Sequence, residues 1–155
     1  MGSTVQISGT TANNFTSPVT YTVTAADSST QNYTVTVTIA SPLSGSLDIS
    51  FGTGGIVTTA VGSGAWANAL GIQTDGKIVA AGYSSNGSNE DFILVRYNAD
   101  GSLDTTFGTG GTVTTAVGSG AWANALGIQT DGKIVAAGQS SNGSNEDFIL
   151  VRYWP

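Results

Sequence analysis

Two pairs of adjacent carboxylates are the side chains of this sequence whose type most often does acid and base chemistry. Glu90 precedes Asp91, and Glu146 precedes Asp147 at the same place in a repeated segment. A glycoside hydrolase places two carboxylates on either side of one bond, but neighbours on an extended strand point to opposite faces. Equivalent repeats also provide equivalent environments, whereas acid and base roles need separated pKa values. We therefore do not interpret these pairs as a hydrolytic site.

The other groups that catalysis commonly uses are missing from the sequence. It contains no Cys and no His, which excludes imidazole catalysis, imidazole ligands and thiolate metal sites. A Ser or Thr nucleophile needs a neighbouring base, and the only lysines, Lys77 and Lys133, follow Asp-Gly turns that we expect to be exposed. We predict that the protein is not an enzyme and that any metal it binds is a hard cation with oxygen ligands.

One loop spaces its oxygen-bearing side chains as calcium-binding loops do. Asn98, Asp100, Ser102 and Asp104 occupy every second position. The alternative interpretation is an Asx-turn that joins two structural units, with the Asp side chains accepting hydrogen bonds from nearby backbone N–H groups. The absence of a bidentate Glu at the twelfth position favours the turn. Calcium is the only cofactor that the sequence suggests.

Aromatic side chains provide the candidates for a ligand site or an interface, namely Trp66, Tyr83, Trp122 and Trp154. An exposed Trp stacks on sugars or anchors a protein partner. Trp66 and Trp122 recur at the same place in the repeat. Because repetition indicates a structural role, we favour core packing between repeats for these two.

The charged residues are few and acidic residues dominate. The sequence has 4 basic and 10 acidic residues, a formal net charge of −6, and no cluster of Lys and Arg. Nucleic acid is therefore excluded as a partner. Arg96 and Arg152 recur once per repeat, which favours ion pairs with an Asp or Glu of the same or the neighbouring repeat over anion binding. No apolar run reaches the roughly 18 residues that span a membrane.

An internal repeat supplies the elements that would position all these residues. Residues 45–99 realign on residues 101–155 with an offset of 56 and only six differences. The residue pattern predicts four strands per repeat. In residues 65–117 these strands lie at 65–73, 77–84, 91–97 and 112–117, and the Asp-Gly pair marks a hairpin between the first two. Four strands per repeat are typical of a propeller blade. We predict an all-β fold with four-stranded antiparallel blades at residues 45–100 and 101–155.

The repeat also resembles a known family. Its Gly-Ser-Leu-Asp, Phe-Gly-x-Gly-Gly, Asp-Gly-Lys-Ile and Arg-Tyr motifs make residues 45–155 similar to the delta-60 repeat of large bacterial extracellular proteins. The resemblance implies a β-propeller-like fold and a secreted or cell-surface bacterial protein. The sequence departs from a closed propeller because it holds two repeats, whereas closure takes about four to eight blades.

Residues 1–44 form a separate segment with a single charge, Asp27. Two alternating runs within 18–40 predict a β-hairpin with one Val/Ile/Tyr face and one Thr face. The segment resembles the C-terminal part of a bacterial immunoglobulin-like or cadherin-like surface domain. Half a β-sandwich leaves an apolar face uncovered and strand edges free.

These observations predict a structural or adhesive module rather than a catalyst. Two stacked repeats leave one strand-rich face exposed at each end, because each repeat is stabilised chiefly by its neighbours. We expect self-association through these faces and strand edges, as a closed ring or as a fibre. The alternative is a lectin-like propeller that binds a glycan or a surface protein through the loop at 85–90 and nearby aromatic residues.

Overall fold

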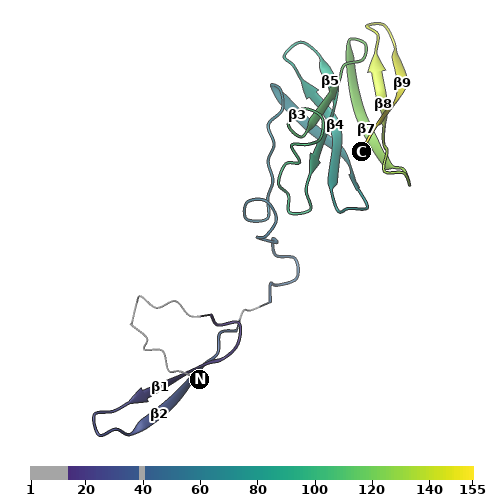
Figure 1. Ribbon diagram of the computed structural model, residues 1–155. Helices are drawn as coiled ribbons and strands as arrows, with labels where there is room; N and C mark the ends of the chain where they lie inside the picture. Colours follow the sequence, from purple (N-terminus) through teal and green to yellow (C-terminus); the bar gives the residue numbers. More distant parts are fainter. Residues whose placement is uncertain (1–13, 39–40) are drawn as a thin grey trace. The chain divides into compact units, whose positions relative to one another are not determined.

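The computed structural model describes residues 14–38 and 41–155, and these contain β-strands, turns and loops without any helix. The chain divides into two units, Met1–Ser44 and Gly45–Pro155 (Figure 1). Within the described residues, therefore, no helix is present that is long and apolar enough to span a membrane. The all-β prediction is confirmed.

The N-terminal unit contains one antiparallel hairpin of β1 (Val19–Thr24) and β2 (Thr30–Val35). Asp27 fixes its turn, because its Oδ1 accepts hydrogen bonds from the N–H and the hydroxyl of Ser29 at 3.0 and 2.6 Å. The two predicted faces are present, since threonines bond across one side while Val23 and Tyr33 are more than half exposed. The predicted second run ends earlier, at Val35, and residues 39–40 lie outside the described part of the chain.

The second unit contains two antiparallel sheets. The first has four strands in the order β3 (Gly64–Ile72), β4 (Ile78–Ser85), β5 (Glu90–Tyr97) and β6 (Thr112–Thr115). The second has three strands in the order β7 (Gly120–Ile128), β8 (Ile134–Ser141) and β9 (Glu146–Tyr153). Each Asp-Gly pair turns the chain between the first two strands of its sheet, as predicted.

The fourth strand of the first sheet comes from the second repeat. β6 follows the repeat boundary at residue 101 and pairs with β5 through Phe92↔Thr115 to Val95↔Thr112. The prediction of four strands therefore holds for the first sheet, while the second sheet has three. In the first sheet, β6 begins 15 residues after Tyr97, the last residue of β5, and so belongs to the next repeat.

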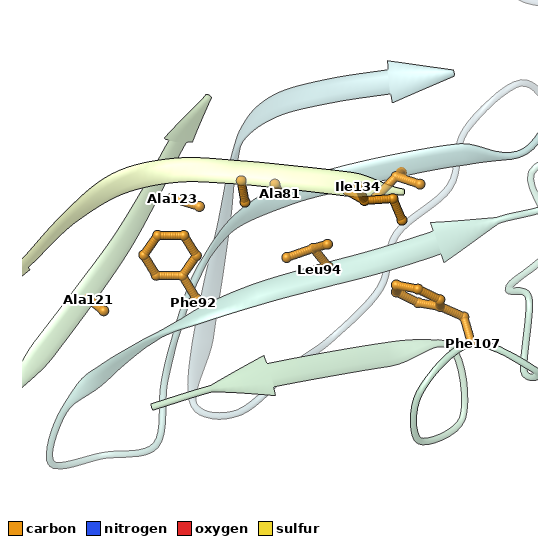
Figure 2. Close-up of a cluster of buried hydrophobic side chains, with 9 residues drawn as sticks. Ala81, Phe92, Leu94, Phe107, Ala121, Ala123 and Ile134 are labelled. Carbon is orange, nitrogen blue, oxygen red and sulfur yellow. The ribbon is translucent and has the colours of Figure 1, made fainter. Parts of the chain in front are cut away.

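The hydrophobic core lies between the two sheets (Figure 2). Alternate residues of β4 and β5 face alternate residues of β7 and β8, because successive side chains of a strand point to opposite faces. The buried set comprises Val79, Ala81, Phe92, Leu94, Phe107, Ala121, Ala123, Ile134 and Ala136. Phe92 of the first sheet lies near Ala121 and Ala123 of the second, and these small side chains let the sheets approach closely at this point.

A β-bulge on β3 forms an additional link between the sheets. The register shifts between Ala67 and Ala69, and the extra residue is Asn68. Its Nδ2 donates a hydrogen bond to the carbonyl of Ala123 on β7 at 2.9 Å. The bulge thus turns a polar side chain toward the neighbouring repeat.

Candidate functional site

The best-formed polar cluster lies where the second repeat begins, around the carboxylate of Asp104. Its Oδ2 accepts hydrogen bonds from Nζ of Lys77 at 2.9 Å and from Nε of Arg96 at 2.8 Å. Its Oδ1 accepts from the N–H and the hydroxyl of Thr106 at 3.1 and 2.6 Å. The Asp104 and Arg96 side chains are both buried. Buried charges of this kind need paired partners, and here both carboxylate oxygens have them.

This cluster attaches the loop at 101–111 to the edge of the first sheet. The guanidinium of Arg96 lies over the ring of Phe107, 4.4 Å from its centroid. The backbone of Arg96 also donates to the carbonyl of Gly111 and accepts from the N–H of Asp104, at 3.0 and 2.9 Å. The prediction that Arg96 pairs with an acid of its own or the neighbouring repeat is confirmed, and the acid belongs to the neighbouring repeat. The Thr106 hydroxyl and the Lys77 ammonium together hold the pKa of Asp104 well below its usual range.

The equivalent residues at the two ends of the unit lack this arrangement. Asp48, the counterpart of Asp104, is exposed and accepts hydrogen bonds from the N–H and hydroxyl of Ser50. Lys133, the counterpart of Lys77, pairs with Asp131 and lies over the ring of Trp154 at 4.6 Å. Arg152 is exposed, and the ion pairs found in residues 14–38 and 41–155 do not include it.

The predicted calcium loop forms a closed turn. Asp100 Oδ1 accepts hydrogen bonds from the N–H and hydroxyl of Ser102 at 2.9 and 2.7 Å, and Asn98 Nδ2 donates to Ser102 Oγ at 2.9 Å. Asp104 does not join them, because it bonds to Lys77 and Arg96. The described residues contain no group of three or more acidic, His or Cys side chains suited to a metal. Calcium binding by this loop stays the less favoured of the two interpretations.

The aromatic candidates occupy different environments. Trp66 and Tyr83 are cross-strand partners whose rings stack with centroids 4.9 Å apart and 14° between their planes. Trp66 is 51% exposed, so the core packing that we favoured for it is wrong. Trp122 is partly buried and lies opposite Gln139, while Trp154 is 77% exposed. The structure thus brings together only Trp66 and Tyr83 of the four.

A polar loop adjoins this aromatic pair. Gly64 pairs with Ser85 two positions beyond the Trp66 and Tyr83 pair, which places the loop at 86–89 at the same end of the sheet. Asn86 Oδ1 accepts hydrogen bonds from two backbone N–H groups of the loop, and its Nδ2 donates to Asp91. This bond ties Asp91, near the start of β5, to the loop.

One face of the second sheet carries exposed apolar side chains. Phe148 and Leu150 of β9 are 97% and 71% exposed. Phe148 borders a shallow hollow of about 370 Å³ that Ala137 and Gln139 also line. Exposed apolar patches of this kind mark interaction sites.

Sequence reasoning missed the inter-sheet bond of Asn68 and the identity of the acid that pairs with Arg96. The available signal for the acid was that Lys, Arg and the Asp of Gly-Ser-Leu-Asp each recur once per repeat. The bulge at Asn68 had only a weak signal in the sequence, because Ala-Asn-Ala does not interrupt the alternation of the strand.

Comparison with protein families agrees with the repeat organisation. Residues 73–107 and 129–155 match a family described as a domain of unknown function (DUF5122) β-propeller, and residues 1–37 match one described as SGBP, N-terminal. No curated protein and no solved structure matches the chain. The matched segments cover β4 and β5 in the first repeat and β8 and β9 in the second. Residues 45–155 therefore contain β-propeller-like repeats.

Proposed function

We propose that this chain is a non-catalytic structural or adhesive module of the bacterial cell surface or exterior, and that it associates with copies of itself. The observation that carries the proposal is the contrast between two identical strands. Phe92 and Leu94 of β5 are fully buried, whereas Phe148 and Leu150 of β9 are exposed. The second sheet thus presents the surface that the first sheet buries within the molecule.

The energetic argument concerns the burial of these side chains. Covering a fully exposed Phe or Leu contributes roughly 1.5–3 kcal/mol each. The surface that fits them is already known from the core, where Phe92 and Leu94 pack near Ala121 and Ala123. The counterparts of these alanines, Ala65 and Ala67, are exposed on β3. One molecule therefore carries both halves of the same interface, which produces head-to-tail association.

The family matches support a surface location. SGBP stands for surface glycan-binding protein, and its N-terminal family matches residues 1–37. The resemblances of the repeats to delta-60 repeats, and of residues 1–44 to part of an immunoglobulin-like or cadherin-like domain, point to the same compartment. Among the described strands, β1 and β2 pair only with each other, so the edges of this hairpin add a further surface for pairing with other chains.

Sedimentation equilibrium over a range of concentrations tests the proposal. We expect the unaltered chain to form multimers and the Phe148→Ser/Leu150→Ser variant to be a monomer with unchanged circular dichroism. Val23→Ser is the control, because Val23 is 55% exposed but belongs to the N-terminal hairpin. A chain that remains monomeric at millimolar concentration would overturn self-association.

A second candidate function is glycan binding at the stacked pair of Trp66 and Tyr83. Sugars pack their apolar faces against exposed aromatic rings, and Trp66 is half exposed beside the polar loop at 86–89. The SGBP match supports a glycan as the ligand. A glycan array probed with the unaltered chain and with Trp66→Ala tests it. Equal signals from the two proteins would exclude this pair as the site.

A further inference from the structure

We propose that residues 45–61 of a second copy complete the second sheet, where they pair with β9 as β6 pairs with β5. This inference rests on the proposed self-association and specifies its partner, its direction and its register. The expected backbone pairs are Thr59 with Phe148, Thr58 with Ile149, Val57 with Leu150 and Ile56 with Val151, by analogy with the observed pairing of β5 and β6.

The acceptor edge, which is the side of β9 that does not pair with β8, has the same sequence as the side of β5 that pairs with β6. β5 and β9 have the same sequence, Glu-Asp-Phe-Ile-Leu-Val-Arg-Tyr. β5 pairs with β4 on one side and β6 on the other, whereas β9 pairs only with β8 among the described strands. The free side of β9 therefore presents the same backbone groups and side-chain spacing that bind β6, and a free edge is a template for pairing.

Residues 45–61, the donor segment, already have the backbone conformation that pairing with β9 requires. Residues 45–61 differ from residues 101–117 at only three positions. The Thr53 N–H donates to the Ile56 carbonyl at 2.9 Å, as Thr109 donates to Thr112 at 2.8 Å. Gly55 has a φ of 88°, close to the 95° of its counterpart Gly111. Because the segment is preorganised, its ordering on binding costs little.

The donor segment makes only one of the two contacts that its counterpart makes. In the second repeat, Thr115 pairs with β5 through its backbone and bonds to Tyr153 of its own repeat at 3.0 Å. In the first repeat, Thr59 accepts the equivalent bond from Tyr97 at 2.8 Å, but residues 56–59 pair with no other strand of the described chain. The hydrogen bond from Tyr97 thus attaches the segment to its own repeat, while the backbone of residues 56–59 can pair with a strand of a second copy.

The charges at the two ends are complementary. Asp48 is exposed at the donor segment, and Arg152 is exposed at the end of β9. In the proposed pairing, Asp48 takes the position that Asp104 occupies between Lys77 and Arg96. Lys133 then exchanges Asp131 for Asp48, which corresponds to the bond that Lys77 makes to Asp104. Such complementary charges set the direction and register of an interface.

Cross-linking of single-cysteine variants tests the register, since the natural sequence contains no Cys. Thr58→Cys chains are mixed with Ile149→Cys chains and oxidised. Paired residues on antiparallel strands have Cα atoms about 4.5–5.5 Å apart, which suits a disulfide. We expect a covalent dimer in the mixture and no such dimer in either variant alone. The matched intramolecular control is Ile93→Cys/Thr114→Cys, an observed pair of the first sheet.

The outcomes separate this inference from the proposed function. Multimers in sedimentation without a disulfide in the mixture would overturn the strand pairing and leave self-association intact. A dimer of Ile149→Cys with itself would indicate symmetric pairing of two β9 edges and would also overturn it. A monomeric unaltered chain would remove both proposals.

Charge reversal provides an independent test. We expect Asp48→Arg or Arg152→Asp alone to weaken association at least about tenfold, because each leaves like charges facing one another. A chain with both substitutions restores the opposite charges and should recover most of the loss. Asp27→Arg is the control, because Asp27 has the same bonds to a following Ser as Asp48 but lies in the N-terminal hairpin. Failure of the double variant to recover would contradict the proposed ion pair.

Discussion

Phe92 and Phe148 occupy the same position of an identical strand sequence, yet Phe92 is fully buried and Phe148 is 97% exposed. Sequence-encoded preferences are equal at the two positions, so the difference comes from what lies against each sheet. The face of the first sheet that carries Phe92 packs against the second sheet, whereas the face of the second sheet that carries Phe148 is exposed. The pair therefore permits the effect of packing to be measured at constant sequence.

Truncation of these two phenylalanines should affect different properties. We expect Phe92→Ala to lower the free energy of unfolding by about 3–5 kcal/mol, because it leaves a cavity between the sheets. Phe148→Ala should change the stability of the monomer little and weaken self-association instead. Chemical denaturation at low protein concentration, together with sedimentation, distinguishes the two effects. Equal losses of stability would contradict the burial difference.

The ion pair of Asp104 should make stability depend on pH in the acidic range. Its pKa is lowered in the folded protein, so the unfolded chain takes up a proton at higher pH than the folded one does. The stabilisation is therefore complete above about pH 5 and is lost progressively as the pH falls below the ordinary Asp pKa of about 3.9 toward the lower pKa of Asp104 in the folded protein.

Thermal unfolding of Asp104→Asn and the unaltered chain checks this dependence. We expect Asp104→Asn to melt at a clearly lower temperature at pH 7 and the difference to shrink toward pH 2. Asp48→Asn is the control. Asp48 accepts bonds from Ser50 as Asp104 does from Thr106, but the ion pairs of the described residues do not include it. If the two proteins differ in melting temperature by the same amount at pH 7 and at pH 2, the result would argue against the ion pair.

The strands and hairpins were predictable because their signals are local. Asp75-Gly76 requires a tight turn, and Gly76 indeed has a φ of 83°. The pairing of Asp104 with Arg96 was less accessible, because the acid belongs to the repeat after the arginine. Trp66 was placed wrongly because recurrence does not distinguish an inter-sheet contact from one within the sheet. Its ring stacks on Tyr83 of its own sheet instead.

The bulge on β3 depends on a glycine that sequence analysis did not single out. A Cβ at Gly82 would lie 1.8 Å from the carbonyl oxygen of Trp66. We expect Gly82→Ala to lower the free energy of unfolding on the order of 3 kcal/mol, since the backbones cannot separate without breaking pairs. Gly127→Ala is the control, because nothing lies within 4 Å of its added Cβ. Similar stabilities for the two variants in urea would refute the close approach.

The loop that includes Asn98, Asp100 and Ser102 provides a test of the calcium prediction against the turn. Its side chains bond to one another, and Asp104 is engaged by two cations. We therefore expect millimolar Ca²⁺ or EDTA to leave the melting temperature unchanged. An increase with Ca²⁺ that Asp100→Ala abolishes would establish the metal site. An increase that survives in Asp100→Ala would place the ion elsewhere.

The one aromatic difference between the repeats gives a matched test of glycan binding. Tyr83 in the first repeat corresponds to Gln139 in the second, and only Trp66 has a stacked partner in the described structure. We expect Tyr83→Gln to remove most sugar-dependent quenching of Trp fluorescence and Gln139→Tyr to add a second site beside Trp122. The physical reason is that a second ring widens the apolar surface on which a sugar stacks. Titration with soluble oligosaccharides measures both variants. Binding that persists unchanged in Tyr83→Gln would exclude the stacked pair as the platform.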